Sequence, residues 1–144
     1  MSELVRRHHI QTCRDHHAVL RDLIRGVPAA APVAASHAVD AIARLRLVLL
    51  RHLQLEDAWL YPALEQLDRP EVTAAVRRYR EEMGGLSAAF VAFADSWSAA
   101  DRVAREPAAY LAAWPPMCSA LLRRIDAEDD DLYELAESAL RAGS

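Results

Sequence analysis

A chain of 144 residues is long enough for one domain with its own core, and we expect a single domain over residues 1–144. Hydrophobic residues make up 53% of it, much of this content is Ala and Leu, and only four residues are Gly, which favours helices over strands. The net charge of −4 excludes the basic surface that nucleic acids and anionic membranes attract, so neither is expected as a partner. The apolar runs end well before the roughly 18 residues of a membrane span, and the N-terminal residues lack a signal-peptide core. We therefore expect a cytoplasmic protein.

The first predicted helix runs from Ser2, a residue type that caps helix N-termini, to Arg25, with Gly26 ending it. Apolar residues recur along this segment at steps of three and four, as on the inward face of a bundle helix. His17 falls in the middle of that face. His16 lies one step round, at the edge of the face.

The second predicted helix follows a short proline-containing connection over residues 27–32. It runs from Ser36, the predicted N-cap, to Gln66. Pro62 lies within its last turns and should kink the helix or loosen its hydrogen bonds locally.

The remaining elements complete an all-α, up-down-up-down four-helix bundle. The third helix is predicted over Pro70–Trp97, with Pro70 at its first position. A short extra helix is expected around Pro107–Trp114, then a break at the prolines that follow. The fourth long helix is predicted over Pro116–Leu140.

Polar residues interrupt the inward faces of the second and fourth helices. His52 and Glu56 are four residues apart, which places both side chains on the inward face of one helix. Near the C-terminus the pattern recurs imperfectly, with Glu128 in the place of Glu56 and Arg124 in the place of His52. Buried polar side chains need partners, so these residues are either an internal hydrogen-bonded network or a metal site.

At these residues the chain resembles the hemerythrin-like (HHE) cation-binding domain. The resemblance rests on four motifs, which are His17-x-x-Leu20, His52-x-x-x-Glu56 with Leu-Tyr-Pro after it, Glu82, and Glu128-x-x-x-Leu-Tyr-x-Leu-Ala-Glu137. In that family the bundle holds two irons that are bridged by carboxylates and bind or sense oxygen, nitric oxide or iron. The resemblance thus implies a hemerythrin-like bundle with iron as its cofactor.

The resemblance also implies that half of the ligand set is replaced. The family takes the terminal histidines of one iron from helices one and two, where His17 and His52 stand, and its bridging carboxylates correspond to Glu56 and Glu128. The other iron takes its histidines from helices three and four, where this chain has Met83 and Arg124, with Tyr79 at a further position that some members use.

The predicted site is therefore mononuclear, with His17, His52, Glu56 and Glu128 as ligands and iron expected before zinc or manganese. Arg124 would take the place of the second ion and form forked hydrogen bonds to both glutamates. Met83, Arg124 and Tyr79 are the expected residues around a bound ligand, and whether His16 or Glu82 joins the site stays open.

Three functions remain open from the sequence. The first is sensing or sequestration of a metal or of a small ligand, which would be oxygen, nitric oxide or peroxide. The second is a non-haem iron enzyme that uses oxygen or peroxide. The third is a metal-free scaffold for a partner, in which Arg124 bridges the glutamates. The sequence also leaves the oligomeric state open, a homodimer included.

Overall fold

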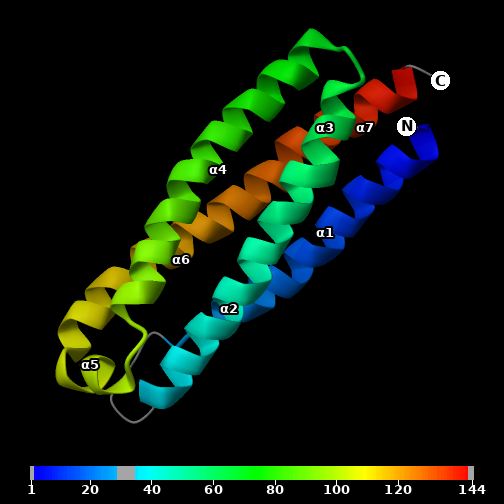
Figure 1. The fold of residues 1–144 in the computed structure, drawn as a ribbon. Helices are drawn as coiled ribbons and strands as arrows, with labels where there is room; N and C mark the ends of the chain where they lie inside the picture. The colour runs from blue at the N-terminus through cyan, green and yellow to red at the C-terminus, as the bar shows by residue number, and fades with distance from the viewer. Residues whose placement is uncertain (1, 29–34, 143–144) are drawn as a thin grey trace.

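Long helices lie side by side along the whole molecule (Figure 1). The computed structural model describes residues 2–28 and 35–142. Its elements, in chain order, are α1 (Glu3–Arg25), α2 (Ala35–Leu55), the π-helix η2 (Glu56–Leu60), α3 (Tyr61–Glu65), α4 (Pro70–Ser96), α5 (Ala100–Arg105), α6 (Pro107–Ala127), the π-helix η3 (Glu128–Leu132) and α7 (Tyr133–Ala142).

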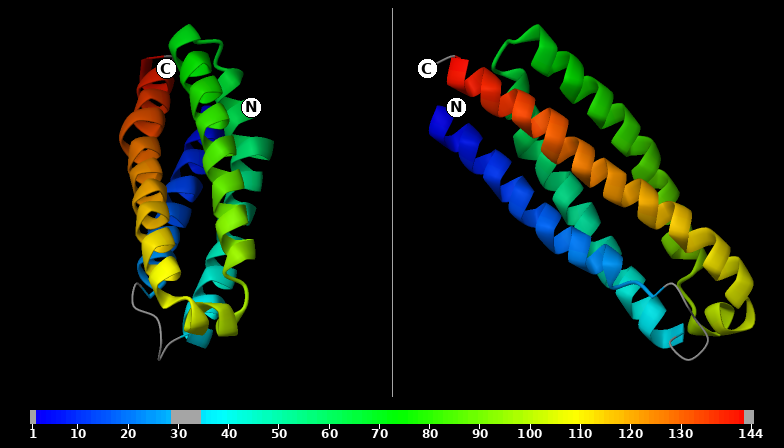
Figure 2. Two further views of the ribbon diagram at one scale, coloured as in Figure 1. Left: turned by 90° about the vertical axis from the view of Figure 1, so that its left-hand side faces the viewer. Right: turned by 180° about the vertical axis from the view of Figure 1, so that it is seen from behind.

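The helices form the predicted up-down-up-down bundle. In the described part of the chain α2, η2 and α3 make one rod, and α6, η3 and α7 make another (Figure 2). Both α1 and α4 contact α2 and α6, so the four rods form a ring around a shared interior. The two termini lie at one end of the bundle and α5 lies at the other (Figures 1 and 2). None of the described helices is both long enough and apolar enough to cross a membrane.

The boundaries of the first and third helices agree with the prediction. Ser2 precedes α1, and its Oγ accepts a hydrogen bond from the backbone N–H of Val5 over 3.2 Å. Gly26 ends α1. Pro70 begins α4, where its missing N–H costs no hydrogen bond, and Trp97 follows the last helical residue.

Three predicted boundaries are wrong. Ser36 is not the N-cap of the second helix, because α2 already includes Ala35, and most of the predicted connection before it lies outside the described residues. The expected break at Pro115 and Pro116 does not occur, since α6 continues from Pro107 to Ala127. Both prolines are exposed, so water can bond to the carbonyl groups that lose a backbone partner there. The short extra helix was predicted around Pro107–Trp114, but those residues begin α6, and the short helix is instead α5, which ends at Arg105.

A polar layer divides the core of the bundle. One apolar cluster, towards the α5 end, includes Leu20 and Leu49, and the other, towards the termini, includes Cys13 and Leu60. Four buried polar or charged residues lie between these clusters along the helices, and they are His17, His52, Glu56 and Glu128. The fold thus places these side chains at one level inside the bundle.

Candidate metal centre

Two π-helices position the glutamates of the buried layer. Glu56 is the first residue of η2, and Glu128 is the first residue of η3. Each π-helix is followed by a tyrosine, Tyr61 or Tyr133, whose backbone N–H reaches back five residues to the carbonyl of that glutamate. The sequence repeat therefore corresponds to a repeated local structure, and such wide turns within α-helices occur often at functional sites.

Pro62 accounts for only one of the two wide turns. It follows Tyr61 and lacks the N–H that an α-helix would use, which agrees with the predicted loosening of the second helix. The second wide turn has Glu134 at the matching position and no proline. The feature that the two turns share is a buried glutamate followed by a leucine and a tyrosine.

Two nitrogen atoms and one oxygen atom converge at the centre of the layer. Nε2 of His17 lies 3.1 Å from Nε2 of His52, and Nε2 of His52 lies 2.6 Å from Oε1 of Glu56. One donor atom from each of these residues lies within 4.8 Å of the others. His17, His52 and Glu56 are at most 3% exposed, so this group is almost completely buried.

Glu128 faces the same centre from the opposite rod. Its Oε1 lies 3.9 Å from Nε2 of His17, and its Oε2 accepts a hydrogen bond from the Tyr61 hydroxyl over 3.4 Å. The Tyr133 hydroxyl makes the corresponding bond to Oε2 of Glu56 over 3.3 Å. Each tyrosine thus fixes the glutamate of the other π-helix.

Contacts to the Nδ1 atoms, on the side away from the centre of the layer, orient the two imidazole rings. Nδ1 of His17 donates a hydrogen bond to Oδ1 of Asp129 over 2.8 Å, which leaves the lone pair of Nε2 directed into the centre when the ring is neutral. Nδ1 of His52 lies 3.2 Å from Nδ1 of His16. His16 therefore stands behind His52 and does not face the centre.

Burial sets the charge state of the layer. Loss of hydration lowers the pKa of His17 and of His52, so both rings are neutral near pH 7. Burial raises the pKa of Glu56, and burial together with the nearby Glu56 carboxylate raises the pKa of Glu128. Among the four side chains of the buried layer there is no permanent cation to balance these carboxylates.

The residues fit a divalent metal ion. Two donors bound at right angles, each about 2.1 Å from one ion, are about 3 Å apart, which agrees with the 3.1 Å between the two Nε2 atoms. Oε1 of Glu56 is buried and has no hydrogen-bond partner among the described residues, since its close contact with His52 lacks hydrogen-bond geometry. A buried oxygen without a partner is costly unless a cation binds it. Two imidazoles with carboxylates suit iron, manganese or zinc.

A comparison with known families decides the wider classification. The hemerythrin HHE cation-binding domain matches residues 8–136. The chain belongs to this family. Comparisons with curated proteins and with solved structures found no match. The match spans most of α1 to α7, including all four residues of the buried layer, and it implies a metal cofactor for this hemerythrin-like domain.

The predicted fork from Arg124 to Glu56 and Glu128 is wrong. Arg124 donates from Nη1 to Oε2 of Glu82 over 2.7 Å and from Nη2 to the carbonyl O of Tyr79. Its guanidinium carbon also lies 4.3 Å from the centre of the Tyr79 ring. Because Glu82 is more than half exposed, Arg124 pairs with a carboxylate that stays hydrated, which avoids burying a second charge in the layer.

The three residues expected around a bound ligand do not share one cavity. Tyr79 and Arg124 are in contact at the edge of the bundle, where the Tyr79 hydroxyl donates to the carbonyl O of Ala127. Met83 packs in the apolar cluster towards α5 and lines a cavity of about 110 Å³ with Tyr61. Glu82 lies with Arg124 and outside the polar layer.

Asp129 is the main site residue that the sequence reasoning missed. From helical spacing alone, the run of acidic residues from Asp126 to Asp131 has the pattern of a solvated face with Glu128 as its inward member. Asp129 instead accepts from His17 and forms an ion pair with Arg21 at 2.5 Å. The wide turn of η3 rotates consecutive residues differently from an α-helix, so both Glu128 and Asp129 reach the interior side. A repeat of the Glu-x-x-x-Leu-Tyr pattern was the available signal for this turn.

Proposed function

We propose that this hemerythrin-like protein binds one metal ion at His17, His52, Glu56 and Glu128. Iron is the metal that we expect first, and zinc and manganese are the alternatives. The observation that carries the proposal is the unpartnered buried Oε1 of Glu56 beside two Nε2 atoms that face each other. His17 and His52 would supply neutral imidazole nitrogens, and the two glutamates would supply the balancing negative charge. Any of these ions would act as a Lewis acid and could take a small ligand, and iron or manganese would add redox capacity.

The proposed stoichiometry is one ion per chain. Among the described residues, one group of three closely placed His, Cys, Asp or Glu side chains could hold a metal, and it is His17, His52 and Glu56. The positions that the family resemblance assigns to the second set of histidines hold Met83 and Arg124. The fixed positive charge of Arg124 lies on α6, one turn before Glu128, and opposes a second cation there.

The proposed role is sensing or sequestration of the metal or of a small ligand such as oxygen, nitric oxide or peroxide. A cavity of about 250 Å³ between α1 and α2 has His52 in its wall, together with His16, Val19, Val48, Arg51 and Leu55. This cavity gives a small molecule a path to the ring of His52. The hypothesis of a metal-free scaffold required Arg124 to bridge both glutamates. Arg124 bonds to Glu82 and to Tyr79 instead, so the structure does not support that hypothesis.

Anaerobic titration of the metal-free protein with Fe(II) tests the proposal. We expect saturation at one equivalent, followed by a change in visible absorption when nitric oxide is added. The His52→Ala variant should show neither effect, whereas His8→Ala, which removes an exposed histidine of α1, should behave as the wild type. Saturation at two equivalents would contradict the mononuclear site, and unchanged binding in His52→Ala would remove His52 from the ligand set.

A further inference from the structure

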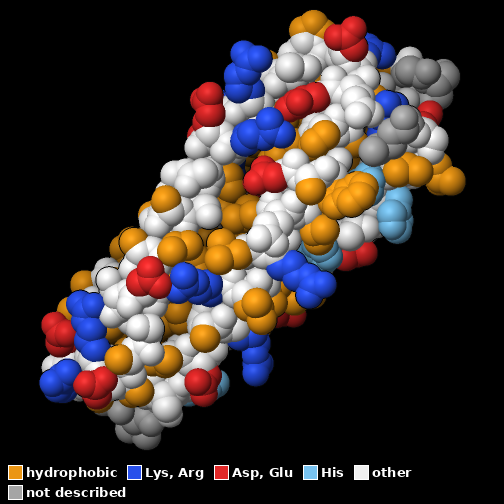
Figure 3. Space-filling model, in the orientation of Figure 1, with side chains coloured by type: hydrophobic (Ala, Val, Ile, Leu, Met, Phe, Trp, Pro, Cys, Tyr) orange, Lys and Arg blue, Asp and Glu red, His pale blue; other side chains and the backbone are white. Residues whose placement is uncertain are grey.

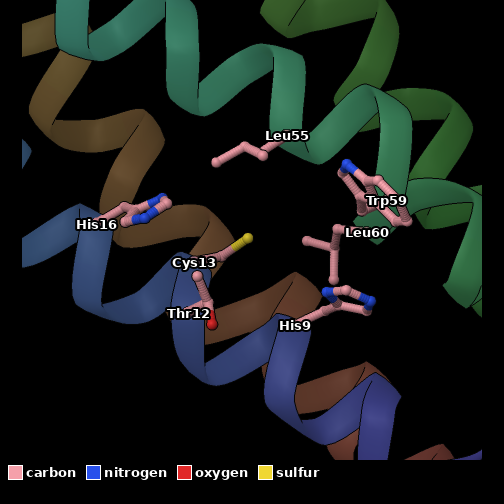
Figure 4. Close-up of a pocket in the computed structure, with 7 residues that line it drawn as sticks. All are labelled: His9, Thr12, Cys13, His16, Leu55, Trp59 and Leu60. Atoms are coloured by element: carbon pink, nitrogen blue, oxygen red, sulfur yellow. The ribbon is translucent and has the colours of Figure 1, made fainter.

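A separate pocket opens between α1 and the rod formed by α2 and η2. It has a volume of about 290 Å³, near the lower end of the range for small-molecule sites. Seven residues line it (Figure 4), and they are His9, Thr12, Cys13, His16, Leu55, Trp59 and Leu60. Hydrophobic side chains and histidines also lie next to each other on this side of the molecule in Figure 3.

The floor of the pocket is buried, whereas its rim is exposed to solvent. Cys13 and Leu60 form a buried floor, with exposed fractions of 4% and 1%. Trp59 stands at the rim and is 54% exposed, which is unusual for the largest apolar side chain. The ring of His9 lies 6.1 Å from the ring of Trp59, at an angle of 31°. The opening is thus flanked by flat aromatic surfaces.

The lining selects for a neutral aromatic ligand. Asp, Glu, Lys and Arg are absent from the lining residues, so a charged molecule would lose hydration without gaining an ionic partner. Trp59 and the two imidazoles offer ring faces and edges, against which another aromatic ring packs with a gain beyond simple burial. The imidazole nitrogens and the Thr12 hydroxyl can bond to one hydroxyl or N–H group of the ligand.

One residue of the pocket contacts the metal centre directly, and a second packs beside a tyrosine that supports it. His16 lines the pocket, and its Nδ1 lies 3.2 Å from Nδ1 of His52. Cys13 packs in the same apolar cluster as Tyr133, whose hydroxyl bonds to Glu56. The pocket and the metal centre therefore share a wall, and a molecule in one contacts side chains that orient ligands in the other.

We propose that this pocket binds a small neutral aromatic molecule with one hydroxyl or N–H group, and that His16 links its occupancy to the metal centre. The binding itself does not depend on the proposed metal, whereas the linkage does. Linkage is reciprocal, so a metal ion that changes the orientation of His52 must change the affinity of the pocket by the same factor as the aromatic ligand changes the affinity for metal.

The first experiment uses the metal-free protein with 4-ethylphenol as the probe and nuclear magnetic resonance as the readout. The chain has three tryptophans, of which Trp97 and Trp114 are buried, so the indole N–H signal of Trp59 reports on the pocket. We expect saturable shifts of the Trp59 signal, with affinities at least about tenfold lower for 4-ethylbenzoate and for 4-ethylcyclohexanol. Equal affinity for all three compounds, or no saturable shift with 4-ethylphenol, would overturn the proposal.

A pocket-filling variant locates the binding. Leu55 is partly exposed, so Leu55→Trp should fill the pocket without unfolding the bundle, and it should abolish the shifts. Leu47→Trp is the matched control, because Leu47 is 71% exposed on α2 and does not line this pocket. Binding that persists in Leu55→Trp with a folded spectrum would overturn the proposed location.

The second experiment tests the linkage. One equivalent of Zn(II) should change the affinity for 4-ethylphenol by about fivefold in the wild type, and His16→Ala should reduce that change to within error. Zinc uptake without any change in probe affinity would overturn the linkage. Failure of the protein to take up zinc would instead count against the metal site of the proposed function, so the two failures are distinguishable.

Discussion

Tyr133 donates a hydrogen bond from its hydroxyl to Oε2 of Glu56 over 3.3 Å, and the two residues belong to opposite halves of the repeat. Tyr61 makes the reciprocal bond to Glu128 over 3.4 Å. These crossed pairs connect the second and fourth rods at the level of the buried layer. They hold one oxygen of each glutamate, so the other oxygen of each stays directed towards the histidines.

Tyr133→Phe should weaken metal binding. Removing the hydroxyl frees the Glu56 carboxylate to rotate, and loss of such a supporting hydrogen bond typically costs about tenfold or more in metal affinity. Competition with a chelator of known affinity measures the change. Tyr110→Phe is the control, since it removes a buried hydroxyl at the far end of the bundle and should leave affinity unchanged. Equal affinity for Tyr133→Phe and the wild type would show that Tyr133 does not position Glu56.

Asp129→Asn should also weaken metal binding, again by about tenfold. The Asn side chain can still accept from Nδ1 of His17, but it lacks the negative charge that makes the imidazole a better donor to a cation. Asp126→Asn is the matched control, because Asp126 is exposed, lies one turn earlier and also pairs with Arg21. The same chelator competition serves, and equal losses in the two variants would assign the effect to general surface charge.

Met83→His combined with Arg124→His should raise the metal content from about one ion towards two per chain. The double substitution restores imidazoles on α4 and α6 and removes the fixed cation before Glu128. Met83→His with Arg123→His is the control, since Arg123 is exposed on the neighbouring face of α6. If the content of the first double variant stays at one, the replaced residues are not the reason for a mononuclear site.

Stability at high pH should depend on Tyr110. Burial raises the pKa of Tyr110 to about 12, and its hydroxyl donates to the carbonyl O of Pro28 over 2.6 Å. Because the pKa of the folded state lies above the unfolded value of about 10, this contribution is complete below pH 10 and is lost as the pH rises through about 12.

The free energy of unfolding should therefore fall less steeply between pH 10 and 12 in Tyr110→Phe than in the wild type, by about 2 kcal/mol over the interval. Urea unfolding at a series of pH values measures both slopes. The remaining tyrosines titrate in both proteins and cancel in the difference. Parallel curves would show that the pKa of Tyr110 is the same in the folded and unfolded states.

Much of the fold follows from periodicity and helix-end chemistry. The inward face of α1 places His17 correctly, and Ser2, Gly26 and Pro70 mark helix ends as expected. The predicted break at Pro115 and Pro116 is wrong because sequence reasoning considers only that proline removes a backbone N–H. The exposure of both prolines on α6, which lets water bond to the free carbonyl groups, depends on how the bundle packs.

The candidate site was predictable where it follows helical spacing and unpredictable where it does not. His52 and Glu56 share a face by their spacing of four, and the repeat at Glu128 brings in the second carboxylate. Asp129 and the partners of Arg124 depend on the wide turn of η3 and on which exposed carboxylate lies within reach. Both features depend on three-dimensional packing, and the helical period of 3.6 residues gives no information about it.

The metal content of the untagged protein tests the proposed site most directly, and elemental analysis after growth with added iron or added zinc measures it. We expect about one tightly bound ion per chain in the wild type and in His8→Ala, and none in His52→Ala. Absence of metal from the wild type under both conditions, or full retention by His52→Ala, would contradict it.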